Sequence, residues 1–266
     1  MSLSTNIGWC DSTINPSTGC DGCELWNMKQ RSCYAGNLHE NRLAVALPSL
    51  YDPVFTQVRV APGRMTQAAN WHDLRGKERP TKPWLSGLPR FIFVGDMGDF
   101  LSQKVSDEYF SQEILRAVQS EAGQRHIWLL LTKRPRRLAK LATVIGGLPA
   151  NVIAMTTITS QHTADLRIPA LLSIPCYYRA ISAEPLLETI NITSFAPVDW
   201  LITGGESGPG ARPTPFTAFH HLQAQCNRLN IPFFFKQAGG EDKQKGGKKL
   251  DGRTYTAMPR LQLSER

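Results

Sequence analysis

The sequence predicts an α/β fold built on a parallel sheet, in the form of a partial or full (β/α) barrel. Short apolar runs alternate with helix-like stretches, which is the pattern of right-handed βαβ units. The chain has 266 residues, 41% of them hydrophobic and 20% charged. This composition is ordinary for a globular protein, and α/β barrels often have this length. We therefore expect a single barrel domain over residues 1–240.

Six short runs are predicted to be strands that are buried on both faces. Each is rich in β-branched and aromatic residues, and continuous apolarity over a few residues is typical of parallel strands covered by helices. The runs are Phe91–Val94, Ile127–Leu131, Val152–Met155, Tyr177–Ile181, Trp200–Ile202 and Pro232–Phe235.

Three stretches between these runs are predicted to be helices. The first begins near Ser106 and repeats apolar residues at helical spacing from Phe110 to Val118. Arg136–Leu141 and Phe216–Leu229 follow the same pattern. Helices at these positions would connect successive parallel strands.

Polar or charged residues follow every one of the six predicted strands. Because the carboxyl ends of parallel strands meet at one edge of a sheet, or at one mouth of a barrel, these residues are expected to form a functional rim. One polar strand end is expected by chance, whereas six in succession predict a site. The segments are GDMGD at 95–99, TKR at 132–134, TT at 156–157, SAEP at 182–185, TGGES at 203–207 and KQ at 236–237.

The segment 241–266 is predicted to be a basic, flexible C-terminal tail. The whole chain has a net charge of +8, and an excess of positive charge favours polyanionic partners, most often nucleic acid. Contact with nucleic acid is therefore one hypothesis, and a solvated end of the chain is the alternative. The basic residues of the tail are Lys243, Lys245, Lys248, Lys249, Arg253, Arg260 and Arg266.

The sequence shows neither a membrane span nor a secretory signal. No apolar run approaches the roughly 20 residues that a spanning helix needs. The N-terminal segment MSLSTNIGWCDST lacks the basic and apolar regions of a signal peptide. We therefore expect a cytoplasmic protein without a membrane partner. Thiols stay reduced in the cytoplasm, so clustered cysteines there indicate metal binding or catalysis rather than disulfides.

Four of the six cysteines lie in the loop 10–35, with the spacing C-x9-C-x2-C-x9-C: Cys10, Cys20, Cys23 and Cys33. A C-x2-C pair lets two thiolates reach one metal centre across a tight turn, and thiolates at this density suit zinc or an iron–sulfur cluster. The spacing alone favours neither alternative. One is an iron–sulfur cluster, and the other is a zinc ion that pins the N-terminal segment to the barrel.

Two rim features have both a functional and a structural interpretation. The glycine-rich loop after Gly204 matches no phosphate-binding motif, so it either brings its backbone close to a cofactor or forms a demanding turn. The carboxylates Asp96, Asp99, Glu184 and Glu206 are suited to binding an amine, orienting a ribose or moving protons. For Asp99 a helix cap or a surface charge is the expected role.

A basic cluster after one predicted strand contains Lys133, Arg134, Arg136 and Arg137. It suits a phosphate group or the carboxylate of a cofactor. For Arg136 and Arg137 a solvated position at the start of a helix is the expected alternative.

Eight segments resemble, in chain order, the phage- and plasmid-associated three-Cys-motif family. The resemblance covers almost the whole chain, and GGESGPGARP followed by FFFKQ is its most specific part. The segments are NPSTGC at 15–20, CYA at 33–35, FVGDMGDF at 93–100, LTKRP at 131–135, ISAEPLL at 181–187, ITGGESGPGARP at 202–213, FFFKQAGG at 233–240 and LDGR at 250–253.

The resemblance implies a radical-SAM-like barrel, distantly similar to the spore photoproduct lyase branch. In such a barrel Cys20, Cys23 and Cys33 would hold a [4Fe–4S] cluster, and its fourth iron would bind S-adenosylmethionine. Tyr34 resembles the aromatic neighbour of that cluster. The resemblance also implies that Asp96, Ser182, Glu184 and the Gly204-Gly205-Glu206 loop contact S-adenosylmethionine. Lys133, Lys236 and Glu184 are the catalytic residues that we predict to face the substrate.

The cysteine spacing departs from the pattern of radical SAM enzymes. Those enzymes usually show C-x3-C-x2-C, whereas the triad here is C-x2-C-x9-C. The segment ELWNMKQRS at 24–32 therefore resembles an insertion between the second and third ligands. Family members usually have another residue at the position of Cys10, which argues against Cys10 as an obligatory ligand.

The leading hypothesis from the sequence is a radical enzyme that depends on an iron–sulfur cluster and S-adenosylmethionine and acts on nucleic acid or a nucleotide. A protein partner or electron donor belongs to the same hypothesis. One alternative is a zinc-stapled barrel that binds nucleic acid or a partner protein. Another is a hydrolase or nuclease that uses Asp96, Glu184 and Glu206 with a divalent ion.

Overall fold

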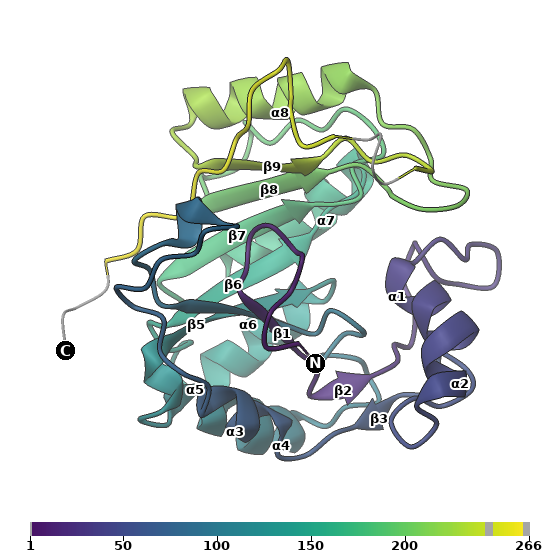
Figure 1. Cartoon of the computed structure of the whole chain (residues 1–266), viewed down its shortest axis with the longest axis vertical. Helices are drawn as coiled ribbons and strands as arrows, with labels where there is room; N and C mark the ends of the chain where they lie inside the picture. The colour runs from purple at the N-terminus through teal and green to yellow at the C-terminus, as the bar shows by residue number, and fades with distance from the viewer. Residues whose placement is uncertain (1, 243–246, 263–266) are drawn as a thin grey trace.

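The computed structural model describes residues 2–242 and 247–262, and within them it confirms an α/β fold with a parallel sheet. The main sheet has seven strands in the order β1-β4-β5-β6-β7-β8-β9, and every neighbouring pair is parallel. It curls into a half barrel rather than a closed one (Figure 1). The strands are β1 (Ser12–Ile14), β4 (Arg90–Val94), β5 (His126–Thr132), β6 (Val152–Thr157), β7 (Tyr178–Ala183), β8 (Trp200–Gly204) and β9 (Phe233–Gln237).

A small antiparallel sheet and two groups of helices complete the fold. β2 (Ser17–Thr18) pairs with β3 (Arg59–Val60). Three successive pieces, α1 (Tyr34–Leu38), η1 (His39–Leu43) and α2 (Ala44–Ala46), form one helical arm that stands beside the sheet (Figure 1). The remaining helices are α3 (Arg64–Ala69), η2 (Pro83–Leu85), α4 (Asp107–Tyr109), η3 (Phe110–Leu115), α5 (Arg116–Gln119), η4 (Gly123–Arg125), α6 (Pro135–Val144), α7 (Gln161–Leu172) and α8 (Phe216–Arg228).

All six predicted strands are present, and the three predicted helical stretches correspond to α4–η3–α5, α6 and α8. The first of these begins as expected, because Ser106 Oγ accepts a hydrogen bond from the backbone N–H of Tyr109 at 3.0 Å. Helix α7 was not predicted, although Ser160 and Thr163 form a capping box at its start. The Ser-x-x-Thr pattern at residues 160–163 was the sequence signal for this helix.

Strand β1 was also missed, because two of its three residues are polar. Ser12 and Thr13 are nevertheless buried, since the strand pairs with the buried strand β4. Ser12 Oγ donates to the carbonyl of Leu3 at 2.7 Å and accepts from Arg90 Nη1 at 2.9 Å. These hydrogen bonds satisfy a buried hydroxyl that would otherwise disfavour burial.

The strands bury alternate side chains in two separate cores. Ile92 and Val94 of β4 face the convex side, where they join the core formed with the helices. Phe91 and Phe93 face the concave side and pack in a second core that contains Trp9 and Trp200. The rings of Trp9 and Phe93 lie 4.9 Å apart, so the concave face is filled by side chains from outside the sheet.

Segments from two parts of the chain close the concave face near strand β9. Trp84 packs edge-on against Phe234 and donates from Nε1 to the carbonyl of Gly8 at 2.9 Å. Lys82 Nζ donates to three backbone carbonyls in residues 5–10. The N-terminal segment is thereby fixed over the sheet, and one side of the cavity described below is built from it.

The described part of the predicted tail packs against the sheet. The backbone N–H of Phe235 in β9 donates to the carbonyl of Tyr255 at 2.8 Å, and Trp200 Nε1 donates to the carbonyl of Ala257 at 2.8 Å. Leu250 is fully buried. Residues 250–257 thus contribute to the fold, in contrast to the expected flexible tail. Lys243, Lys245 and Arg266 lie outside the described residues.

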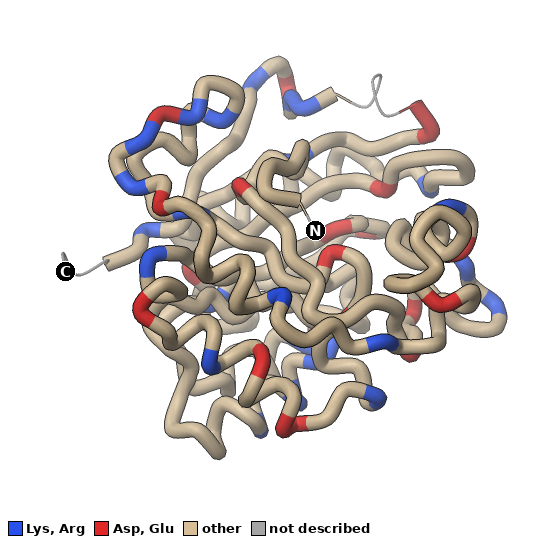
Figure 2. Tube along the Cα trace, turned by 60° about the horizontal axis from the view of Figure 1, so that its bottom comes forward, with Lys and Arg blue, Asp and Glu red and all other residues tan. Residues whose placement is uncertain are grey.

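Basic and acidic residues are interspersed over the side of the molecule that Figure 2 shows. Of the basic residues assigned to the tail, Lys248, Lys249, Arg253 and Arg260 are exposed. None of the helices in residues 2–242 and 247–262 combines the length and the apolar character that a membrane crossing requires.

Candidate functional site

A cavity of about 660 Å³ lies at the carboxyl ends of the strands, where the sequence predicted a functional rim. Its volume is within the range of small-molecule and cofactor sites. It brings together every predicted site residue except Gly204. Those lining it are Cys20, Cys23, Cys33, Tyr34, Asp96, Lys133, Ser182, Glu184, Gly205, Glu206 and Lys236.

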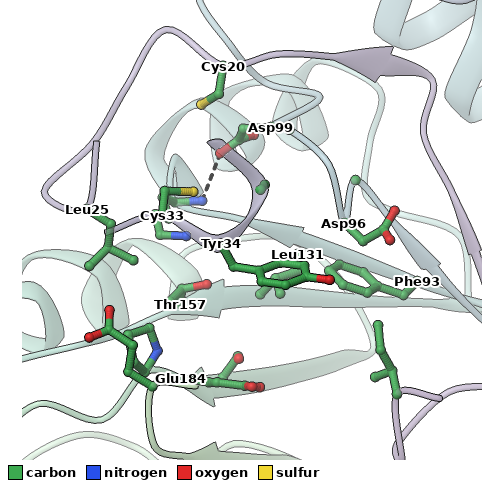
Figure 3. A pocket seen from close by; sticks show the side chains of 18 of the residues that line it. Cys20, Leu25, Cys33, Tyr34, Phe93, Asp96, Asp99, Leu131, Thr157 and Glu184 are labelled. Carbon is green, nitrogen blue, oxygen red and sulfur yellow. Dashed lines mark hydrogen bonds between the residues drawn. The ribbon is translucent and has the colours of Figure 1, made fainter. Parts of the chain in front are cut away.

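The labelled side chains divide the cavity into regions (Figure 3). Cys20, Cys33 and Asp99 gather on one side, and Glu184 lies on the opposite side of the view. Phe93 and Leu131, from the ends of β4 and β5, contribute an apolar surface between them. A ligand in this cavity would therefore meet the thiols and Asp99 at one end, Glu184 at the other and an apolar surface between them.

The loop between the second and third cysteines folds back on itself. Cys23 and Trp26 exchange two backbone hydrogen bonds of 3.0 Å, and the N–H of Cys33 donates to the carbonyl of Leu25 at 3.0 Å. Gly22 makes the preceding turn with a φ of 100°, where a Cβ would lie 2.7 Å from the carbonyl oxygen of Trp26. The hairpin returns Cys33 to the cavity. This explains how nine residues can separate Cys23 from Cys33 while both line the same cavity.

Cys10 does not join the other three cysteines. It is fully buried in the concave core with Trp9 and Phe91, and it does not line the cavity. Burial raises the pKa of its thiol, so it behaves as a small apolar side chain there. The structure therefore does not assemble the four-cysteine site that the zinc alternative requires.

Within residues 2–242 and 247–262, no group of three His, Cys, Asp or Glu side chains is arranged to hold a metal ion. A [4Fe–4S] cluster places each thiolate on a different iron, so its ligands lie further apart than those of one ion. Cys20, Cys23 and Cys33 are free thiols around one cavity. In kind and number they match three of the four thiolates that usually hold such a cluster.

Two of the cavity thiols, those of Cys20 and Cys23, favour the protonated form. Burial, together with the nearby Asp99 carboxylate, raises the pKa of Cys20 to about 11, and burial also raises the pKa of Cys23. A metal centre binds thiolates, so its binding at this site must displace these protons.

Arg134 anchors the cysteine loop from the end of β5. Its guanidinium forms an ion pair with Asp21, donates to the carbonyl of Gly22 at 3.3 Å and lies 3.3 Å from Asp99. Its Nη1 is 4.0 Å from Cys20 Sγ. Arg134 thus links the segment from Cys20 to Cys23 to the rim of the sheet.

Two further arginines hold the hairpin between Cys23 and Cys33. Arg167 of α7 binds both oxygens of Glu24, at 2.9 and 2.6 Å. Arg212 donates to Ser32 Oγ at 3.0 Å while it also binds Glu206. Bidentate arginine pairs fix orientation as well as distance, so the hairpin is tied to the barrel at both ends. The sequence analysis missed these anchors, because each joins residues more than 100 positions apart.

Asp99 is a buried acceptor that joins two loops, whereas the sequence analysis expected a helix cap or a surface charge. Its carboxylate accepts from the backbone N–H groups of Leu101 at 2.9 Å and Lys133 at 3.0 Å, and from Thr132 Oγ1 at 2.8 Å. Arg134 is its ionic partner. Asp99 therefore joins the loop after β4 to the loop after β5, on the side of the cavity where Cys20 and Cys33 lie (Figure 3).

The three carboxylates of the predicted hydrolase site each have a separate partner. Glu184 pairs with Lys236, and Asp96 accepts from Asn15 Nδ2 at 2.6 Å. Burial raises the pKa of Asp96, whereas for Glu206 hydrogen bonds from Arg212 outweigh burial and lower the pKa. Among the described residues these carboxylates form no group of three arranged to hold one metal ion.

Lys133 lies on the thiol side of the cavity. Burial alone would lower its pKa, but Glu24 and the ionised, thiolate forms of Cys23 and Cys33 outweigh burial and raise it. Lys133 is thus placed to balance negative charge near the cysteines, in addition to the substrate-facing role predicted from the sequence. Arg137 is not solvated, because it donates to the carbonyl of Leu101 at 3.1 Å.

Gly205 permits close contact between the ends of β8 and β9. A Cβ at this residue would lie 2.0 Å from the carbonyl oxygen of Ala238, whereas at Gly204 the nearest atom is 3.4 Å away. Of the two interpretations that the sequence left open, a cofactor contact or a demanding turn, the glycine at residue 205 is explained by its contact with the neighbouring loop. Gly204 does not line the cavity.

We predict that Gly205→Ala lowers the free energy of unfolding by about 1–3 kcal/mol, the usual effect of overpacking a filled site. Gly204→Ala is the matched control, and we expect it to cost less than Gly205→Ala. Urea denaturation of both variants measures the difference. Equal losses of stability would show that the contact with Ala238 is not the reason for glycine at residue 205.

Comparison with known proteins gives the chain a family. Neither the curated proteins nor the solved structures contain a match to it. One family model matches residues 4–259, and its description is "Protein of unknown function (DUF5131)". This match includes the cysteine loop, the whole parallel sheet and the residues that pack beside β9. The chain belongs to the DUF5131 family.

Proposed function

We propose that this protein is an iron–sulfur enzyme of the radical SAM type. In this proposal Cys20, Cys23 and Cys33 hold a [4Fe–4S] cluster, and S-adenosylmethionine occupies the same cavity. The observation that carries it is the gathering of these three free thiols around one cavity at the carboxyl ends of a parallel half barrel. The resemblance to the three-Cys-motif family supports it independently.

Three ligands suit this chemistry better than four. Cys10 lies in the concave core, so one iron of a cluster held by the other three cysteines would have no protein thiolate. When bound, a cluster of this kind supplies one electron for the reductive cleavage of S-adenosylmethionine. That step requires an electron donor, for which a partner protein is the natural source.

The chain's own residues bind and orient the cofactor. Asp96 and Glu184 line the cavity and are suited to the cationic groups of S-adenosylmethionine. Because Glu184 already pairs with Lys236, it would bind the cofactor and Lys236 together. Ser182 and Tyr34 add hydroxyl groups to the wall of the cavity. Phe93 contributes apolar surface that excludes water from the reacting atoms.

Lys133 and Arg134 offset the negative charge of a thiolate-bound cluster. Both line the cavity, and both have a pKa that nearby negative groups raise, although burial opposes the rise. Both side chains therefore remain protonated at neutral pH. The proposed substrate is nucleic acid or a nucleotide, which the net charge of +8 favours.

The proposal is tested by incubating anaerobically reconstituted protein with S-adenosylmethionine and dithionite. We expect 5′-deoxyadenosine and methionine to form, and to form only with reductant. Cys226→Ala is the control, because Cys226 belongs to the buried face of α8 and does not line the cavity, so this variant should keep the activity. A cluster-loaded protein that neither binds nor cleaves S-adenosylmethionine would contradict the proposed reaction.

A further inference from the structure

Arg134 is the point at which the barrel makes contact with a cysteine sulfur of the proposed cluster. Its Nη1 lies 4.0 Å from Cys20 Sγ, and the same guanidinium reaches the carbonyl of Gly22 at 3.3 Å. Only 18% of the Arg134 side chain is exposed. The position of its charge is therefore set by the protein and is weakly screened by solvent.

Two carboxylates fix the guanidinium in place. Asp21 belongs to the cysteine loop itself, and Asp99 belongs to the loop after β4. The side chains of Asp21 and Asp99 are 14% and 9% exposed, so all three charged groups are largely buried together. One cation with two carboxylates has a formal charge of −1, and removal of the cation would leave −2 beside Cys20.

The other arginines that hold the cysteine loop do not approach a sulfur in this way. Arg167 binds Glu24 and the carbonyl of Thr157 at 2.9 Å. Arg212 binds Ser32 and Glu206. The three side chains thus share the task of anchoring one loop, and among these anchors only Arg134 also donates toward a cysteine sulfur.

We infer that Arg134 is a positioning residue that sets both the location of Cys20 and the reduction potential of the cluster. This inference rests on the proposed function. Hydrogen bonds and positive charge near the sulfurs of a cluster favour its reduced, more negative state. Arg134 supplies both to Cys20, from a side chain that the fold holds in one orientation.

The test compares Arg134→Gln with Arg167→Gln in anaerobically reconstituted protein. Each variant removes one arginine anchor of the cysteine loop, but only the first removes the charge beside Cys20. In redox titrations monitored by electron paramagnetic resonance, we expect Arg134→Gln to lower the ratio of reduced to oxidised cluster about tenfold at a fixed potential. For a one-electron couple this equals a shift of ~59 mV to lower potential. Arg167→Gln should change the ratio much less, because Arg167 binds Glu24 and the carbonyl of Thr157 rather than a cysteine sulfur.

Arg134→Lys provides the conservative variant. Lysine keeps the charge but cannot make the planar, forked contacts of arginine. We therefore expect Arg134→Lys to restore most of the wild-type ratio of reduced to oxidised cluster. Its iron content should stay below that of the wild type. Loss of the cluster from Arg134→Gln but not from Arg167→Gln would also support the inference, because both variants remove an anchor of the same loop.

Equal effects of Arg134→Gln and Arg167→Gln, on the potential or on cluster loading, would overturn the inference. Both arginines would then act only as structural anchors. A wild-type protein that binds no cluster would overturn the proposed function and this inference together. A wild-type cluster whose potential does not respond to Arg134 would overturn this inference alone.

Discussion

Replacement of Cys20, Cys23 or Cys33 by alanine is expected to abolish cluster binding, whereas Cys10→Ala should retain it. The first three cysteines line the cavity, and each would supply one of the three protein ligands. Cys10 is buried in the concave core, where its removal costs packing but no ligand. Iron and acid-labile sulfide per chain, measured after anaerobic reconstitution, distinguish the variants.

The comparison requires that all four variants remain folded, which circular dichroism establishes. We expect less than about one-tenth of the wild-type iron in each cavity variant, because a cluster with two protein thiolates is readily lost. Iron content that falls as far in Cys10→Ala as in Cys20→Ala would contradict the three-ligand arrangement. It would instead favour a site on all four cysteines.

The second large effect is expected at Asp99. Asp99→Ala should lower the free energy of unfolding by about 3–5 kcal/mol, since it removes one of the two largely buried carboxylates that pair with Arg134. The backbone N–H groups of Leu101 and Lys133 also lose their acceptor. Urea denaturation followed by tryptophan fluorescence measures this loss.

Asp107→Ala is the matched control for Asp99→Ala. Asp107 also forms an ion pair with an arginine, Arg137, but its side chain is 64% exposed. An exposed pair contributes at most about 1 kcal/mol, so this variant should be nearly as stable as the wild type. Similar losses from both substitutions would show that Asp99 does not hold the two rim loops together.

The strands of the sheet could be predicted because burial on both faces leaves a local signal. Runs such as Ile127–Leu131 are apolar at every position, which only a fully covered strand allows. Strand β1 gave no such signal, because Ser12 and Thr13 are buried through hydrogen bonds rather than apolarity. Its presence depends on pairing with β4, about 80 residues later in the chain.

The position of the site could be predicted for a similar reason. Parallel strands bring their carboxyl ends to one edge whatever their order, so the polar residues after each strand had to converge. This reasoning placed Asp96, Ser182, Glu184 and Lys236 around one cavity, as the structure has them. It did not require knowledge of any individual contact.

The anchors of the cysteine loop could not be predicted from local pattern. Arg134 meets Asp21, and Arg167 meets Glu24, across more than 100 residues of sequence. An arginine that follows a strand can be solvated or paired with a carboxylate. Only the folded chain shows which carboxylate each arginine meets. The same limit applies to Leu250, whose burial depends on the neighbouring β9 region rather than on its glycine- and lysine-rich surroundings.

The hairpin at 24–32 accounts for the unusual cysteine spacing. Its backbone pairs Cys23 with Trp26 and brings Cys33 beside Leu25, so nine residues are added without moving the third cysteine away from the cavity. Trp26 is buried within it and packs edge-on against Phe55. Trp26 thus anchors the hairpin in a small core that also contains Ala35, Tyr51 and Phe55.

We propose above all that Cys20, Cys23 and Cys33 hold an iron–sulfur cluster. Metal and acid-labile sulfide analysis of protein purified without oxygen, with an absorption spectrum before and after dithionite, tests it most directly. We predict about four iron and four sulfide per chain, with broad absorption that dithionite bleaches. One zinc per chain without sulfide would contradict the account and would make the cysteines a structural site.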